Sequence, residues 1–255
     1  LFFVPSLFFW GSGILKDPLT LAALGWATFS LYKIFFEKKG VWFYAFALFV
    51  AMYILYTVKI YIILCFVPAA LFWILYGHLA KIKNIILRFM VAPVVLAAAL
   101  ILGYYSIVKI GEASPRYNID TMMYTAEVTA EWIHYVSVKE GGSAYTLGDF
   151  DYSPTGILKK FPQAVWVTLF RPYLWESKNL VMILSALESL AMLIFTVFVI
   201  YKCGFFKFLR LISKKPVLLF CFIFTIGFSF AVGISTYNFG SLVRYKIPMI
   251  PFFLC

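Results

Sequence analysis

Long apolar runs recur along the whole chain, and they constrain the fold more than any other feature. Each main run is close to the roughly 20 residues that a helix needs to cross a bilayer. The runs cover residues 18–36, 41–57, 60–77, 89–108, 180–200 and 217–235, with shorter runs at 1–14 and 247–255. Backbone groups in lipid must bond within their own segment, and no alternating pattern of a membrane β-strand competes. We therefore predict an all-α, polytopic membrane bundle of about eight spans, the first and last truncated.

The composition excludes a soluble globular domain. Of the 255 residues, 64% are hydrophobic and only 13% are charged, whereas a soluble fold needs a polar exterior. The net charge of +11 would suit nucleic-acid binding, but the basic residues stand in short loops between apolar runs. There they set the topology and meet anionic lipid. We expect membrane lipids as partners and no nucleic acid.

The charges alternate from loop to loop. One set of loops contains a single acid, Glu37, and the basic residues Lys33, Lys38, Lys39, Lys81, Lys83, Arg88, Lys202, Lys207, Arg210, Lys214 and Lys215. The opposite short loops contain Lys16, Lys59, Arg244 and Lys246. The positive-inside rule predicts that the first set is cytoplasmic. The alternation holds only if residues 41–77 form two spans that separate at Lys59.

This pattern divides the chain into three parts. Residues 1–108 form spans one to five, residues 109–179 form a long extracytoplasmic loop, and residues 180–255 form spans six to eight. Within the loop we expect an amphipathic helix over about 120–138. A second one, basic and rich in Trp, follows Ser153-Pro154 and suits the membrane interface.

Two short segments resemble a known superfamily, and a third resembles another group of membrane proteins. Residues 5–18, PSLFFWGSGILKDP, are followed by an apolar helix with a basic end, and they resemble a segment of polyprenyl-phosphate-sugar-dependent glycosyltransferases of the GT-C type. That group includes the dolichyl-phosphate-mannose mannosyltransferases and the bacterial aminoarabinose transferases. Residues 238–251, NFGSLVRYKIPMIP, resemble a late Arg-Tyr…Pro…Pro run of the same membrane domains. Residues 170–176, FRPYLWE, are similar to uncharacterised bacterial proteins of envelope-polysaccharide systems.

The resemblance implies an enzyme of the bacterial inner membrane. It would move a sugar from a polyprenyl-phosphate carrier to an envelope glycan or lipid on the outer, periplasmic face. Asp17 matches an outer-loop acid that can help to hold a divalent cation, Mg²⁺ or Mn²⁺, near the donor phosphate. It is our one candidate catalytic residue, because the family's main catalytic acid lies in a first outer loop that would precede Leu1. The alternative for Asp17 is a helix N-cap before Pro18.

Two further groups of residues are candidates for substrate binding. Arg244 and Lys246, with Asn238 nearby, suit a phosphate at the outer edge of the bilayer, because an Arg fork matches phosphate oxygens. The alternative is that the two cations reach towards lipid headgroups. Arg171 and Glu176 could bind a sugar and its phosphate, with Trp175 stacked on the sugar. Their alternative is an ion pair beside an aromatic anchor.

Two acidic features remain. Asp149-Phe150-Asp151 has the spacing of a D-x-D metal motif, although we favour a simple turn, because Asp151 precedes Ser153-Pro154. Glu188 is the one acid deep inside a span, and such a residue needs a polar partner or a cavity.

Other functions fit the same residues. An O-antigen or exopolysaccharide polymerase or ligase would also handle a carrier pyrophosphate. A transporter or flippase of lipid-linked glycans would use the same cations but needs a pathway through the bilayer and usually internal repeats. A scaffold without catalysis is a third alternative. We favour transfer on the outer face, since the polar residues gather there and no repeat is present.

Overall fold

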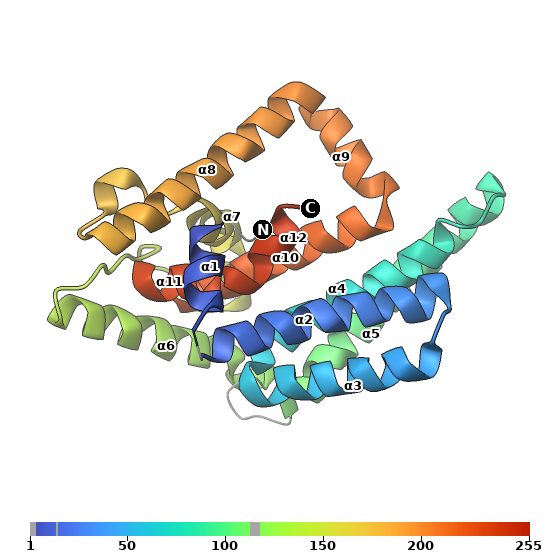
Figure 1. The fold of residues 1–255 in the computed structure, drawn as a ribbon, viewed down its shortest axis with the longest axis horizontal. Helices are drawn as coiled ribbons and strands as arrows, with labels where there is room; N and C mark the ends of the chain where they lie inside the picture. The colour runs from blue at the N-terminus through green and yellow to red at the C-terminus, as the bar shows by residue number, and fades with distance from the viewer. Residues whose placement is uncertain (1–3, 14, 113–117) are drawn as a thin grey trace.

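A computed structural model describes residues 4–13, 15–112 and 118–255, most of which form helices (Figure 1). The helices are α1 Pro5–Gly11, α2 Lys16–Tyr32, α3 Val41–Val58, α4 Ile60–Leu79, α5 Ile85–Glu112, α6 Ile119–Lys139, α7 Pro154–Phe170, α8 Leu180–Cys203, α9 Phe205–Lys214, α10 Pro216–Ser235, α11 Phe239–Tyr245 and α12 Ile250–Phe253. Short turns of other helix types lie at η1 Lys33–Glu37, η2 Leu174–Glu176 and η3 Ile247–Met249. Among the described residues the only extended pairing is an isolated bridge between Ala144 and Asn238.

The all-α membrane architecture is confirmed in its main feature. Six described helices are long and apolar enough to cross a membrane: α2 continued by η1, α3, α4, the Phe89–Glu112 part of α5, α8 and α10. The two end segments are different. Residues 5–11 form one short helix, and residues 247–253 form η3 and α12, so neither is long enough to span by itself. The count of about eight spans stays a prediction.

The split at Lys59 is confirmed. The backbone leaves the helical region there, with φ −148° and ψ 79°, so α3 ends at Val58 and α4 begins at Ile60. The chain reverses at this point, and α4 runs back alongside α3 (Figure 1). The start of α2 and the α3–α4 junction therefore lie at the same end of the bundle.

Aromatic side chains from α4 and α10 form the centre of the bundle. Trp73 stacks on Phe220, with ring centroids 4.8 Å apart, and Phe66 meets Phe220 edge-on at 5.8 Å. Phe36 of η1 stacks on the other face of this group, 5.0 Å from Trp73. It reaches that position because Gly77 has no side chain, and a Cβ there would overlap the Phe36 ring.

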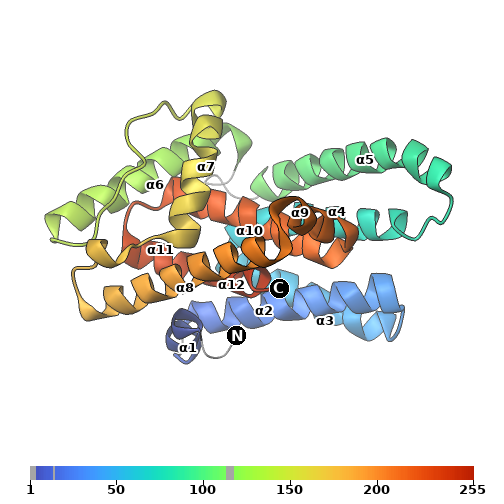
Figure 2. The same ribbon diagram turned by 90° about the horizontal axis from the view of Figure 1, so that it is seen from above.

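The loop between α5 and α8 contains the two expected helices. α6 extends over Ile119–Lys139, and Ser153 caps α7 by accepting a hydrogen bond from the Gly156 amide at 3.2 Å. α7 runs across α10, as a helix lying in the membrane plane would (Figures 1 and 2). Its second half is buried against α10 instead of being exposed at an interface. There Thr168 Oγ1 donates to the Ser229 carbonyl at 2.8 Å.

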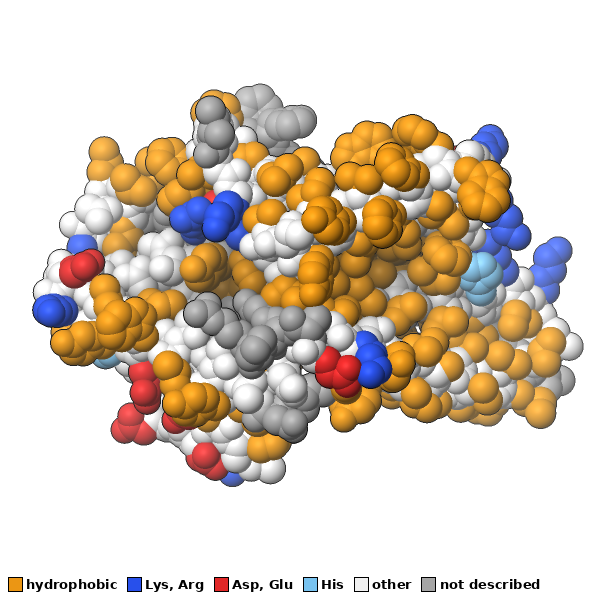
Figure 3. All heavy atoms as spheres, turned by 90° about the horizontal axis from the view of Figure 1, so that it is seen from below, with side chains coloured by type: hydrophobic (Ala, Val, Ile, Leu, Met, Phe, Trp, Pro, Cys, Tyr) orange, Lys and Arg blue, Asp and Glu red, His pale blue; other side chains and the backbone are white. Residues whose placement is uncertain are grey.

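Charge is distributed unevenly over the surface. The connections after η1 and after α4 lie at one end of the molecule, on the right in Figure 1, and α9, which follows α8, runs from the top of the view towards that end. On the face drawn in Figure 3, the basic side chains at that end have no acidic neighbours, whereas the acidic ones lie in the middle and towards the opposite end. The loop-to-loop alternation of charge thus corresponds to two different ends of the folded bundle.

Candidate anion-binding site

Asp17 lies at the centre of a buried charge cluster. Its side chain is only 3% exposed. One carboxylate oxygen, Oδ2, accepts a hydrogen bond from Arg244 Nε at 2.8 Å, and the other, Oδ1, accepts from Lys59 Nζ. The three residues come from the start of α2, the α3–α4 junction and the last turn of α11. We call Asp17, Lys59 and Arg244 the charge cluster.

The position of Asp17 in its helix differs from the N-cap alternative. α2 begins at Lys16 and the N-cap residue is Leu15, so Asp17 belongs to the first helical turn. Its side chain pairs with cations rather than with backbone amides. The backbone is fixed locally, since Thr20 Oγ1 donates to the Asp17 carbonyl at 2.9 Å. A carboxylate is also favoured in a first turn by the helix dipole.

Arg244 is the exposed member of the charge cluster. It is 35% exposed and its guanidinium lies over the Trp10 ring, 5.0 Å from the centroid. Nε binds Asp17, while its two terminal nitrogens make no hydrogen bond to the residues that the structure describes. With two cations and one carboxylate, the cluster has one formal positive charge in excess. Free guanidinium donors beside that excess charge suit an anion such as phosphate.

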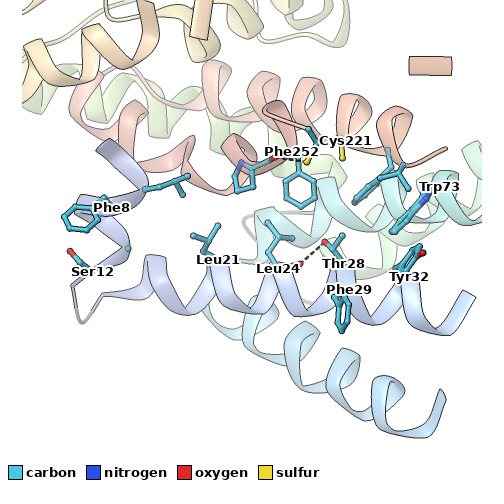
Figure 4. A pocket seen from close by; sticks show the side chains of 17 residues that line it. Phe8, Ser12, Leu21, Leu24, Thr28, Phe29, Tyr32, Trp73, Cys221 and Phe252 are labelled. Carbon is cyan, nitrogen blue, oxygen red and sulfur yellow. Dashed lines mark hydrogen bonds between the residues drawn. The ribbon is translucent and has the colours of Figure 1, made fainter. Parts of the chain in front are cut away.

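An apolar groove begins one helical turn from Asp17. Its volume is about 830 Å³, and it lies between α1, α2, α4, α10 and α12 (Figure 4). On α2 it is lined by Leu21, Leu24, Thr28 and Tyr32, which share the face on which Asp17 stands. Leu21 follows Asp17 by four positions, about 6 Å of helix rise. The charge cluster does not line the groove but stands just beyond its end.

The remaining lining side chains are mostly apolar as well. They are Leu7, Phe8, Gly11, Ser12, Gly25, Phe29 and Trp73, with Val217, Phe220, Cys221, Pro251, Phe252 and Cys255 on the opposite wall. Of the few polar groups, the Thr28 hydroxyl already donates to the Leu24 carbonyl at 2.8 Å. The groove is therefore suited to a hydrocarbon chain and not to a sugar.

Lys246 lies away from the surface position that the sequence predicts, and the partly buried Asn238 has a structural role. Lys246 is fully buried and its Nζ donates to Ser189 Oγ at 2.9 Å, and burial lowers its pKa to about 8. Asn238 caps α11, with Oδ1 accepting from the Ser241 amide at 3.0 Å. Its Nδ2 donates to Ser137 Oγ of α6 at 2.6 Å. Both side chains hold the fold together, so Arg244 alone of this group faces outward.

Glu188 has the polar partner that its position in a span requires. The buried carboxylate accepts two hydrogen bonds from Ser6, from the backbone amide at 2.8 Å and from the hydroxyl at 2.7 Å. This contact fixes α1 against α8. The next residue, Ser189, donates to the Arg171 carbonyl at 3.1 Å and accepts from Lys246. A chain of polar contacts therefore joins α8 to the segment after α7.

Arg171, Glu176 and Trp175 form a separate group. Glu176 accepts from Arg171 Nε at 3.1 Å, from Arg171 Nη2 and from the Tyr173 amide at 2.8 Å. The Arg171 guanidinium lies 5.0 Å over the Phe239 ring, at the start of α11, whereas Arg244 lies at its end. Trp175 is 81% exposed and stacks on Tyr173, with centroids 4.7 Å apart. The structure thus unites Asp17 with Arg244 but leaves Arg171 with its own partner.

The three metal candidates lie in two different settings. Both oxygens of Asp17 are bound by cations, so a divalent ion would have to displace Lys59 or Arg244. Asp149 and Asp151 are exposed, and Asp151 Oδ1 accepts from the Ser153 amide at 3.1 Å in the turn before α7. Within the described ranges, no three His, Cys, Asp or Glu residues are grouped as a metal site would require.

Sequence reasoning overlooked Lys59 as a site residue. The charge alternation identifies Lys59 only as the point where two spans separate, but in the structure it binds Asp17 directly. A signal was present, because the charge alternation places Lys59 and Asp17 on the same side of the membrane. A lone cation at a span end next to few other charges needs a partner. Trp10, which packs on Arg244, had no such signal.

Comparisons with known protein families, with curated proteins and with solved structures found no match for this chain. Its function is therefore inferred from its own residues.

Proposed function

We propose that this chain is a glycosyltransferase-like protein of the GT-C type that takes a sugar from a polyprenyl-phosphate carrier. The acceptor would be an envelope glycan or lipid on the outer face of a bacterial inner membrane, with the basic short loops in the cytoplasm. The observation that carries the proposal is the position of Arg244. Its free guanidinium donors lie beside an excess positive charge, just beyond the end of an apolar groove.

The groove would hold the isoprenoid chain of the carrier. Its α2 wall extends from Leu21 to Tyr32, about 16 Å at the helical rise of roughly 1.5 Å per residue. A chain in this groove would bring its phosphate to the start of α2. The groove would recognise only hydrocarbon, so discrimination among carriers falls to the polar end.

The charge cluster would bind the phosphate. Arg244 offers two donors in a fork, and Lys59 adds a compact positive charge behind it. Asp17 would orient Arg244 through Nε. Its negative charge would also offset the repulsion between Arg244 and Lys59. A Mg²⁺ or Mn²⁺ ion could bridge Asp17 and the donor phosphate only after one cation moved. We therefore propose Asp17 as a positioning group, with the general base supplied elsewhere.

The sugar would lie towards the loop between α5 and α8. Trp175 presents an exposed aromatic face, and Arg171 with Glu176 stands behind it as a rigid pair. Aromatic faces suit the apolar side of a sugar ring, and charged donors suit its hydroxyls. These residues and the charge cluster lie at opposite ends of α11, so a sugar would extend along this helix from one to the other.

Binding of the carrier tests the proposal directly. The purified chain in nanodiscs is titrated with polyprenyl phosphate, and binding is compared for the wild type, Arg244→Gln and Lys16→Gln. Losing a charged hydrogen bond costs about 1.5–3 kcal/mol, so Arg244→Gln should weaken binding roughly 10- to 100-fold. Lys16 is exposed and adjacent in sequence, so its variant should bind like the wild type. If both variants lost the same amount of binding affinity, the effect would come from net charge alone, and the proposed site would be wrong.

Transfer is measured separately with a labelled carrier-linked sugar and membrane lipid acceptors. Sugar found on the acceptor supports transfer. Movement of the intact carrier across the bilayer without transfer would favour the flippase alternative. Glycan chains lengthened by whole units from a pyrophosphate carrier would favour the polymerase alternative.

A further inference from the structure

The connection between α8 and α10 is a helix with an unusual charge distribution. Residues 202–215 contain five basic residues and no acid. From Phe205 to Lys214 this segment forms α9. It begins after Gly204, whose φ of +77° turns the chain sharply at the end of α8. The sequence alone indicated only a basic loop.

α9 has two chemically opposite faces. At 100° per residue, Lys207, Arg210 and Lys214 project on one side, and Phe205, Phe208, Leu209 and Ile212 on the other. No residue of α9 is buried within the chain. On the basic side the three cations line one open face of the helix, together with Phe206 and Leu211.

The position of α9 is fixed by its neighbours. It joins two helices that are each long enough to cross the membrane, so it lies where both of them reach the same surface. Figure 1 shows it running across the direction of α2 and α10 rather than along them. Its far end is held to α4, because Tyr76 Oη donates to the Ser213 carbonyl at 2.7 Å. This orientation is the one expected of a helix that lies in the plane of a membrane surface.

We propose that α9 inserts its apolar face into the bilayer and that Lys207, Arg210 and Lys214 bind the headgroup of an anionic phospholipid. Helices that are basic on one side and apolar on the other lie at membrane interfaces in this manner. An anionic headgroup meets all three cations at once, and no acid of residues 202–215 competes for them. The apolar face explains why the ligand is a membrane lipid and not a soluble anion. This proposal is independent of the proposed function.

Hydrogen exchange of the full chain in nanodiscs tests it. Amide exchange over 205–214 is compared between phosphatidylcholine alone and phosphatidylcholine mixed with phosphatidylglycerol. Each basic residue near an anionic surface strengthens membrane binding by roughly fivefold. With three such residues, phosphatidylglycerol should slow amide exchange in α9 by up to about 100-fold. Equal exchange in the two membranes would overturn the proposal.

The triple variant Lys207→Gln/Arg210→Gln/Lys214→Gln should lose the effect of phosphatidylglycerol. The matched control, Lys38→Gln/Lys39→Gln/Lys83→Gln, removes the same charge from other exposed positions and should keep it. Unchanged exchange in α8 and α10 shows that the triple variant is folded. The charge-preserving variant Lys207→Arg/Lys214→Arg should keep the slowing of exchange by phosphatidylglycerol. A triple variant that still responds would refute the site. If inorganic phosphate slowed amide exchange of the wild type in phosphatidylcholine alone, the site would bind a soluble anion and the lipid proposal would be wrong.

Discussion

Arg244 donates a hydrogen bond to Asp17 at 2.8 Å, although 227 positions separate the two residues. The contact joins the first turn of α2 to the last turn of α11. Lys59 completes it from the α3–α4 junction, so three distant segments meet at one carboxylate. Since the carboxylate is buried, its charge depends on these two cations for compensation.

The pair of Asp17 and Lys59 should be strongly coupled. Asp17→Asn leaves two cations without their anion, one of them nearly buried, and should lower the free energy of unfolding by about 3 kcal/mol or more. Lys59→Met alone should cost less, because Arg244 still pairs with Asp17. The loss of unfolding free energy in the double variant should differ from the sum of the two single-variant losses by at least about 1 kcal/mol. Chemical unfolding in detergent measures the cycle.

A second cycle serves as the control. Lys16 is exposed and precedes Asp17 directly. Lys16→Gln combined with Asp17→Asn should give additive losses, within about 0.5 kcal/mol. Equal coupling in both cycles would mean that Asp17 responds to general charge and not to Lys59.

Gly233 should tolerate no side chain. Its position allows α7 to cross α10, and a Cβ there would overlap the Ala164 carbonyl and lie 2.7 Å from Thr168 Oγ1. Gly233→Ala should therefore destabilise the chain by about 1–3 kcal/mol. Gly227 in the same helix has open space around its Cα, so Gly227→Ala should be neutral or stabilise by up to about 1 kcal/mol. Thermal unfolding of both variants provides the comparison, and the same response at the two glycines would contradict this account of the crossing.

Ser6 should contribute more than a typical surface serine. Its hydroxyl donates to the buried Glu188 carboxylate, and losing a hydrogen bond to a charged group costs about 1.5–3 kcal/mol. Ser6→Ala should lower the melting temperature accordingly. Ser12, at the other end of α1, donates to the Phe9 carbonyl and is exposed, so Ser12→Ala should change stability by less than about 0.5 kcal/mol. A small effect of Ser6→Ala would show that α1 is held mainly by its apolar contacts.

Lys246 should make stability rise with pH. Burial lowers its pKa from 10.5 in the unfolded chain to about 8. Between these two values the unfolded chain holds a proton that the folded chain has lost, so unfolding becomes harder as the pH increases. Below about pH 8 the cost of burying the charge is present in full. Melting temperatures across this range should show the rise, and Lys246→Met should flatten it.

Lys159→Met provides the comparison for Lys246, because Lys159 is exposed on α7. This variant should keep the pH dependence of the wild type. A profile that stays unchanged in Lys246→Met would assign the titration to another group.

The sequence predicted much of the layout because membrane insertion is decided segment by segment. The break at Lys59 followed from the alternation of charge, and the structure has it at the same residue. The cap at Ser153 followed from local chemistry and is also present. Lys246 was different, since a cation next to Arg244 in the chain was expected at the surface. It is buried because it follows Arg244 by two positions at the end of a helix, and therefore points to another side.

Asp17 and Arg244 were each identified from the sequence, but their contact was not. The same holds for the groove, whose walls come from α1, α2, α4, α10 and α12. The sequence by itself determined the all-α membrane architecture, the long segment between α5 and α8 and the separation of charge, because these depend on the transfer of each segment into lipid. Only the tertiary structure shows which polar side chains contact one another, because these contacts depend on how the helices pack and rotate against one another.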